Sequence, residues 1–341
     1  MAMAAEAGGM KILLTHANGA FERYYGAAPL AELEKFGVVH RNLSDAVMDD
    51  RALVDAARGC DLIIADRATP VSEAALAELP DLLAVHRCAV DISTIAVPAA
   101  SRHGVLVTRA SAGFADAAAE LAIGMMIDLG RGISAATGAY RAGAQPRIRM
   151  GTQLRGATLG IVGYGAIGRR LAKLAQGFGL AVLAHDPFLT IGDPGIEQVA
   201  FGALLGRSDF VVCLAPATPE THHLFNAAAF AAMRPGSFFL NLARSSIVDE
   251  AALTAALASG ALTGAAVDVG PARDEMPSLA LAARPDVVAT PHIGGLTPQA
   301  VQHQSHETVR QVAALVAGRM PEGAVNPDCA ARLYARGILR R

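Results

Sequence analysis

Short apolar runs recur along the chain, and most are followed by a polar turn and a stretch with helical spacing. In the first third, the runs that predict strands are residues 11–15, 38–39, 62–65, 82–86 and 105–108. Helical spacing covers residues 29–36, 46–58 and 72–79. Strands and helices that alternate in this way are typical of a parallel sheet with helices on both faces. The pattern therefore predicts one α/β unit in this part of the chain.

A second α/β unit is predicted after a long helix over residues 116–130, which is rich in alanine, methionine and leucine. Its strands are expected at residues 159–162, 181–184, 210–214, 237–242, 264–269 and 287–290, with helices between them that include 227–233 and 250–258. Residues 145–155 read as a loop, and residues 299–318 as a final amphipathic helix. The long helix could pack inside the subunit or against a second one. The fold class is thus two Rossmann-like or flavodoxin-like doubly wound parallel-sheet domains with a cleft between them.

The second unit opens with a glycine pattern typical of dinucleotide sites. The strand at residues 158–162 leads directly into Gly163, Gly165 and Gly168, and a helix is predicted next. These glycines permit a tight turn, a close approach of backbone to pyrophosphate, and close packing of helix on strand. Asp186 ends the following strand and can bind both ribose hydroxyls, which favours NAD over NADP. The predicted cofactor-binding loop is Gly163, Tyr164, Gly165, Ala166, Ile167 and Gly168. An ordinary βαβ crossover without a ligand is the alternative.

Composition and charge exclude several classes of function. Of 341 residues, 52% are hydrophobic and 18% are charged, with a net charge of −2, so the chain lacks the basic surface that nucleic acids or anionic membranes attract. No transmembrane helix or signal peptide is predicted, and residues 1–10 read as a frayed extension. The four cysteines lack metal-ligand spacing. We therefore expect a cytoplasmic protein.

Two side chains at strand ends could carry chemistry. Arg244 follows the apolar strand FFLNLA and could clamp a carboxylate with two hydrogen bonds, although a surface arginine at a strand end would look the same. His292 lies in TPHIGG, where a histidine at the mouth of a cleft could exchange a proton near neutral pH. His303 and His306 share one helix face but have no third ligand, so no metal site is predicted.

These residues belong to a longer pattern that resembles the D-isomer-specific 2-hydroxyacid dehydrogenase family. The segments LAPATPETHHLF and MRPGSFFLNLARSSIVDEAAL match its extended signature. The resemblance implies an NAD-binding domain at residues 109–295, inserted into a substrate-binding domain made of residues 1–108 and 296–341. It also implies a homodimer built largely around the long helix.

The resemblance also assigns roles to residues. Arg244 corresponds to the arginine that orients the substrate, and His292 to the acid/base. Asp268 corresponds to the aspartate near the nicotinamide carboxamide. Pro216, Thr221, Ala243 and Gly294 complete the implied cofactor contacts.

Three segments depart from the family pattern. The glutamate that usually partners the catalytic histidine is replaced by Arg273, so that Asp274 or Glu275 would have to serve as the catalytic carboxylate. Ala89 and Asp91 stand where a loop that binds the substrate carboxylate usually has glycines. Ser245 replaces the glycine that usually follows the arginine.

The sequence therefore predicts an NAD-dependent enzyme that interconverts a D-2-hydroxy acid and a 2-oxo acid. His292 would protonate the C2 oxygen during reduction, and Arg244 would hold the carboxylate. The departures leave two alternatives: a non-catalytic NAD(H)-sensing protein on the same fold, or a dehydrogenase for an unusual acid.

Overall fold

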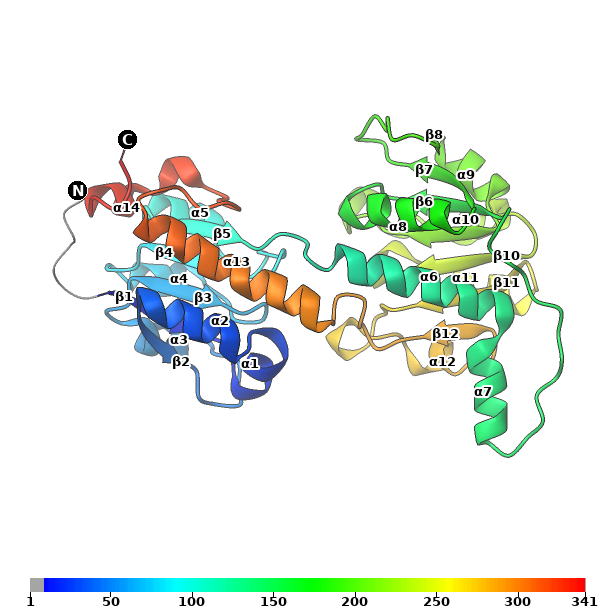
Figure 1. The fold of residues 1–341 in the computed structure, drawn as a ribbon, viewed down its shortest axis with the longest axis horizontal. Coiled ribbons are helices and arrows are strands. Elements are labelled where there is room, and N and C mark those ends of the chain that lie inside the picture. The colour runs from blue at the N-terminus through cyan, green and yellow to red at the C-terminus, as the bar shows by residue number, and fades with distance from the viewer. Residues whose placement is uncertain (1–8, 341) are drawn as a thin grey trace. The chain divides into compact units, whose positions relative to one another are not determined.

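The computed structural model describes residues 9–340, which form two compact units (Figure 1). Unit 1 contains the described residues up to Gly113 together with those from Pro298 onward, and unit 2 runs from Phe114 to Thr297. The chain thus leaves the first sheet, builds a complete second unit, and then returns to the first. The N-terminal extension predicted over residues 1–10 lies mostly outside the described residues.

Unit 1 is built on a five-stranded parallel sheet in the order β2-β1-β3-β4-β5. The strands are β1 (Met10–Leu14), β2 (Gly37–Arg41), β3 (Leu62–Ala65), β4 (Ala84–Arg87) and β5 (Leu106–Arg109). Alternate strand residues point to opposite faces, so Leu13 and Ile63 pack in one core while Ile12 and Ile64 pack in the other. A sheet buried on both faces explains why these strands read as continuous apolar runs.

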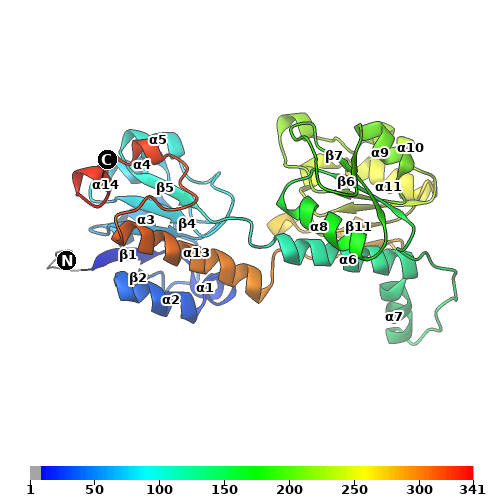
Figure 2. The same cartoon turned by 45° about the horizontal axis from the view of Figure 1, so that its top comes forward.

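Helices cover both faces of this sheet. One face carries α3 (Asp50–Ala57), α4 (Glu73–Ala77) and α5 (Val97–Arg102). The other carries α1 (Asn18–Tyr24), α2 (Ala27–Leu33), α13 (Pro298–Val316) and α14 (Ala331–Ala335), and Figure 2 shows α13 beside α1 and α2. Val309, Val312 and Leu315 of α13 are buried in that core. The C-terminal segment therefore completes the unit that the N-terminal segment begins.

Unit 2 is built on a seven-stranded parallel sheet in the order β12-β11-β10-β9-β6-β7-β8. Its strands are β6 (Thr158–Val162), β7 (Ala181–His185), β8 (Ile196–Gln198), β9 (Phe210–Cys213), β10 (Ser237–Asn241), β11 (Leu262–Val267) and β12 (Val287–Ala289). This order of strands across the sheet is the Rossmann arrangement. The direction in which successive strands are added reverses between β6 and β9. The helices α6 (Ala115–Arg131) and α8 (Ala166–Gly177) pack on one face. The other face carries α9 (Phe201–Arg207), α10 (Ala227–Ala232), α11 (Glu250–Ala258) and α12 (Leu279–Ala282).

These two sheets confirm the two predicted doubly wound parallel-sheet domains, but several element boundaries were wrong. The helix predicted over residues 46–58 is α3, which begins at Asp50. The Asp49 side chain caps it there by accepting from the Ala52 N–H at 2.9 Å. The strand predicted at 264–269 is β11, which begins and ends two residues earlier. Among the described residues, α1, α14 and the helix α7 (Ile133–Arg141) lie where no helix was predicted. The last has no buried residue.

Candidate active site

The glycine loop of unit 2 lies where the strand order reverses, between the carboxyl ends of β6 and β9. Gly163 has a φ of +95°, and a Cβ there would lie 2.6 Å from the backbone N of Ala215. At Gly168 a Cβ would lie 2.5 Å from the Gly163 carbonyl oxygen. In contrast, a Cβ at Gly165 would meet nothing within 4 Å. Gly163 and Gly168 thus allow tight packing, while Gly165 leaves open space at the start of α8.

This open space is suited to a pyrophosphate. Ala166 and Ile167 form the first turn of α8, whose backbone N–H groups have no partner within the helix. Such a helix start, at the switch point of a doubly wound sheet, favours an anionic ligand. The residues present therefore fit a dinucleotide.

Asp186 follows β7 and is held by the backbone. Its Oδ2 accepts from the Tyr164 N–H at 3.0 Å, and its Oδ1 accepts from the Phe188 N–H at 3.0 Å. The first bond ties the carboxylate to the glycine loop. Asp186 is thereby fixed at the end of β7, the strand next to β6. The sequence predicted a ribose contact at this position.

The cofactor-flanking loop after β9 is closed by side-chain bonds. Thr221 Oγ1 donates to the Pro216 carbonyl at 2.7 Å, and the Thr218 N–H donates to Thr221 Oγ1 at 2.8 Å. The two predicted residues Pro216 and Thr221 are therefore brought together within one short loop.

Arg244 stands at the carboxyl end of β10 on a turn that Asn241 braces. The Asn241 side chain accepts from the Ala243 N–H at 3.0 Å and donates to the Arg244 carbonyl at 3.1 Å. The guanidinium donates to the Ala243 carbonyl at 2.7 Å, and its Nε lies 3.5 Å from Glu275 Oε1. Arg244 remains 41% exposed, so its other donors can reach an acid.

The segment that carries His292 is held by Asp268, which is buried at the end of β11. Thr290 Oγ1 donates to the Asp268 carboxylate at 2.6 Å, and the N–H groups of Ile293 and Gly294 donate to it at 2.8 Å each. Asp268 thus fixes the backbone on both sides of His292. Sequence reasoning gave no role to Asn241 or Thr290. Asn241 acts through a turn that forms only where β10 ends, and Thr290 acts through Asp268, which only the sheet brings beside it.

Glu275 lies between the two functional side chains. Its Oε2 is 3.6 Å from His292 Nδ1, while its Oε1 faces Arg244. Asp274 instead contributes its main-chain carbonyl, 3.0 Å from His292 Nδ1, and its carboxylate lies 3.7 Å from the Arg273 guanidinium. Of the two carboxylates proposed from the sequence, only that of Glu275 is directed at His292 in these contacts.

Unit 1 has a polar cluster at the carboxyl ends of its own strands. Arg87 is fully buried and donates to the Asp66 and Thr69 carbonyls and to Thr94 Oγ1. Asp91 accepts from the Ser93 N–H at 2.8 Å, and this bond lowers the pKa of its carboxyl, with Arg67 and Arg87 adding to the effect. Asp91 is therefore a capping carboxylate within its own loop.

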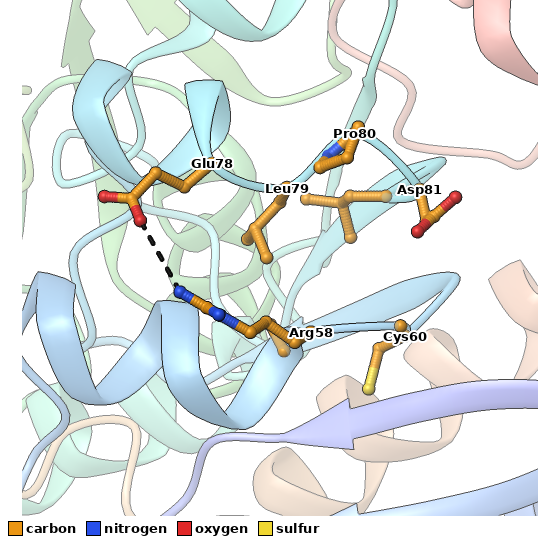
Figure 3. A pocket seen from close by; sticks show the side chains of 9 residues that line it. Arg58, Cys60, Glu78, Leu79, Pro80 and Asp81 are labelled. Carbon is orange, nitrogen blue, oxygen red and sulfur yellow. Dashed lines mark ion pairs between the residues drawn. The ribbon is translucent and has the colours of Figure 1, made fainter.

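A hollow of about 350 Å³ lies at the opposite edge of the first sheet (Figure 3). Cys60 and Leu82 line it, just before β3 and β4, and Arg58 pairs with Glu78 across it at 3.8 Å. This is the amino edge of the sheet, away from the residues predicted to act. Within residues 9–340 no cluster of histidine, cysteine or acidic side chains could hold a metal. No described helix is long and apolar enough to cross a membrane.

Comparison with known proteins gives a consistent picture. Residues 123–294 match the model of the D-isomer specific 2-hydroxyacid dehydrogenase NAD-binding domain, so NAD is the cofactor of unit 2. The (S)-sulfolactate dehydrogenase of Chromohalobacter salexigens is 36% identical over 288 residues, which cover 83% of this chain and 91% of that protein. The D-3-phosphoglycerate dehydrogenase of Mycobacterium leprae is 35% identical over 284 residues, or 82% of this chain.

The chain spans about half the length of that phosphoglycerate dehydrogenase, 54% of which is covered. Among solved structures, D-lactate dehydrogenase from Escherichia coli superposes with a TM-score of 0.79 and 26% identity, covering 93% of this chain and all of that one. The chain therefore belongs to the family of D-isomer specific 2-hydroxyacid dehydrogenases.

Proposed function

We propose that the chain interconverts a D-2-hydroxy acid and a 2-oxo acid, with His292 as the acid/base and Arg244 as the group that binds the substrate carboxylate. The observation that supports this most directly is that the Glu275 carboxylate lies 3.5 Å from Arg244 Nε and 3.6 Å from His292 Nδ1. All three lie on segments that follow strands of the sheet carrying the glycine loop. An arginine, a carboxylate and a histidine in this order supply anion binding and proton transfer together.

In the reductive direction, His292 donates a proton to the C2 oxygen of the 2-oxo acid. The Glu275 carboxylate lies 3.6 Å from His292 Nδ1 and so faces the ring that carries this proton. Arg244 binds the substrate carboxylate and also stabilises negative charge on the adjacent C2 oxygen. The glycine loop and Asp186 would hold the nicotinamide cofactor, which when bound would donate a hydride to C2 in its reduced form or accept one from C2 in its oxidised form.

The substrate is expected to be a small 2-hydroxy acid with a second polar group. The two sequence relatives described above are named for acids that carry a sulfonate or a phosphate. We therefore include 2-oxo acids with a sulfonate or phosphate on C3 in the test panel, beside small, branched, aromatic and dicarboxylic ones.

The decisive experiment compares the unmodified protein with His292→Ala. We expect NADH oxidation with at least one 2-oxo acid, a loss of kcat of about 10³-fold in the variant, and a Kd for NADH within about threefold of the original. Loss of NADH binding together with turnover would contradict the assigned role of His292. NADH binding without turnover on the whole panel would instead favour the NAD(H)-sensing alternative.

We propose that the two units have different roles. Unit 2 carries the NAD-binding domain together with Arg244 and His292. We propose that unit 1 is the substrate-binding domain that the family resemblance implies for residues 1–108 and 296–341. The four cysteines are free thiols, which suits a reducing cytoplasm.

We also propose a homodimer formed through an arm, defined as residues 131–153. The arm contains α7 and the return segment to β6, and Figure 1 shows α7 extending away from the sheet of unit 2. It exposes Ile133, Tyr140, Ile148 and Met150, and the last two are almost fully accessible. Large apolar side chains gathered on a protruding segment indicate a contact with another chain. A second copy is the expected partner, since the long helix α6 leads directly into the arm.

A further inference from the structure

Three of the four described non-glycine residues with left-handed φ values belong to the candidate active site: Asp274, Glu275 and His292, with φ of 59°, 58° and 55°. Non-glycine residues rarely adopt this conformation, and the positions that do so are strained and concentrated at functional sites. The first two are consecutive. Asparagine and aspartate tolerate the left-handed region better than other side chains, but glutamate has no such advantage.

The strained pair belongs to a loop that backbone hydrogen bonds close. The Gly270 N–H donates to the Glu275 carbonyl at 2.8 Å, and the Ala272 N–H donates to the Met276 carbonyl at 3.0 Å. A Cβ at Gly270 would lie 2.3 Å from the Pro277 Cα, so the two ends of the loop touch through backbone. The surrounding structure thus forces the turn, and the turn decides where the Asp274 carbonyl points.

That carbonyl is the nearest acceptor to His292 Nδ1, at 3.0 Å, and it is closer than the Glu275 carboxylate at 3.6 Å. A carbonyl oxygen can only accept, so Nδ1 must carry the hydrogen of this bond. The neutral ring is then held with Nδ1 protonated and Nε2 free to accept a proton. A carboxylate 3.6 Å away is too distant to fix the tautomer by a hydrogen bond of its own.

We propose that the main-chain carbonyl of Asp274, aimed by the left-handed turn Asp274–Glu275, is the group that orients His292 and fixes its tautomer. Glu275 then acts on the charge of the ring and on Arg244, and its carboxylate does not set the ring orientation. His292 thus has two neighbours in this loop: the Glu275 carboxylate, and the uncharged Asp274 carbonyl that positions the ring. The catalytic consequence rests on the proposed function of His292, whereas the tautomer can be observed without it.

The test changes the backbone preference at position 274. Valine is strongly disfavoured in the left-handed region, whereas glycine and asparagine are accommodated there. We expect Asp274→Val to lower kcat by about 10²-fold while the Kd for NADH stays within about twofold. Asp274→Gly and Asp274→Asn should recover most of that loss. Arg273→Ala is the matched control. Arg273 is in the same loop, its side chain is 92% exposed, and its ion pair is with the Asp274 carboxylate rather than with the Asp274 carbonyl.

The spectroscopic test uses ¹⁵N-labelled histidine in the full chain. We expect the His292 signals to show a protonated Nδ1 in the unmodified protein and in Glu275→Gln, and a mixture of tautomers in Asp274→Val. An unchanged tautomer and kcat in Asp274→Val would overturn the proposal. Equal loss in the valine, glycine and asparagine variants would also overturn it, because the carboxylate of Asp274 would then be the active group. If the unmodified protein reduces no 2-oxo acid, the proposed function fails, but the tautomer signals still decide this inference.

Discussion

At the scale of single residues, the choice of cofactor depends on the charge of Asp186. The two backbone bonds to its carboxylate hold it beside the glycine loop, where it would repel a 2′-phosphate. Asp186→Asn keeps an oxygen for the Tyr164 N–H but removes the negative charge. We expect the preference for NADH over NADPH, measured as the ratio of kcat/KM, to fall about tenfold, which corresponds to about 1.4 kcal/mol.

Glu197→Gln serves as the control for this change. Glu197 lies on β8, next to β7, and pairs with Arg207 at 2.7 Å on the surface. Its loss removes one negative charge from the neighbouring strand without touching the glycine loop. If Glu197→Gln shifted the cofactor ratio as much as Asp186→Asn, general surface charge would explain the preference, and a specific role of Asp186 would be refuted.

Single residues also show what the sequence could and could not predict of the site. Arg244 and His292 were identifiable because each follows an apolar strand and matches a family motif. The choice between Asp274 and Glu275 was not, because it depends on two consecutive left-handed residues that turn one side chain inward and the other outward. Asn241 escaped notice because its bonds to residues 243 and 244 exist only once the strand has ended in a turn.

At the scale of elements, the arm at residues 131–153 should determine the oligomeric state. Ile148 and Met150 are almost fully exposed in the single chain, so burying them would provide much of the apolar area in an interface. Ile148→Asp with Met150→Asp would place two charges in that interface. We expect the double variant to be a monomer by light scattering at micromolar concentration, while its circular dichroism stays unchanged.

A matched surface variant separates this effect from a general loss of hydrophobicity. Leu43 is 72% exposed in unit 1, far along the chain from the arm, and Leu43→Asp should leave the dimer intact. A dimer that survives the double change in the arm would refute the proposed interface.

Elements differ in how well sequence alone predicts them. Buried strands such as β3 and β9 were located almost to the residue, because a short, continuous apolar run bounded by polar residues is typical of a strand covered on both faces. The helix α7 was missed because it is short, at nine residues, and none of them is buried, so it carries no run of core residues that would mark it in the sequence. The predicted start of α3 was wrong because its first turn is fixed by the cap at Asp49. The residues before the cap have helical spacing in the sequence but do not belong to the helix.

At the scale of the whole molecule, two buried histidines in unit 1 should make stability depend on pH. Burial lowers the pKa of His16 to about 4, with Arg87 and Arg41 acting in the same direction and Asp66 opposing them. Burial also lowers the pKa of His86 to about 4. His86 Nδ1 lies 2.8 Å from Thr108 Oγ1, which donates to Gln311 Oε1 at 2.7 Å, so the bond to Thr108 requires a hydrogen on Nδ1. Both rings are thus neutral in the folded chain.

The sign of the effect follows from proton counting. Between about pH 4 and pH 6.5 the unfolded chain binds protons at these histidines and the folded chain does not, so the free energy of unfolding falls as the pH is lowered through this range. For one histidine the loss between pH 7 and pH 5 is about 2 kcal/mol. His86→Gln keeps a donor for Thr108 but cannot be protonated. We therefore expect urea unfolding to show a smaller difference between pH 7 and pH 5 in this variant than in the unmodified protein. Identical pH dependence in the two proteins would mean that His86 is already charged, or accessible to protons, in the folded state.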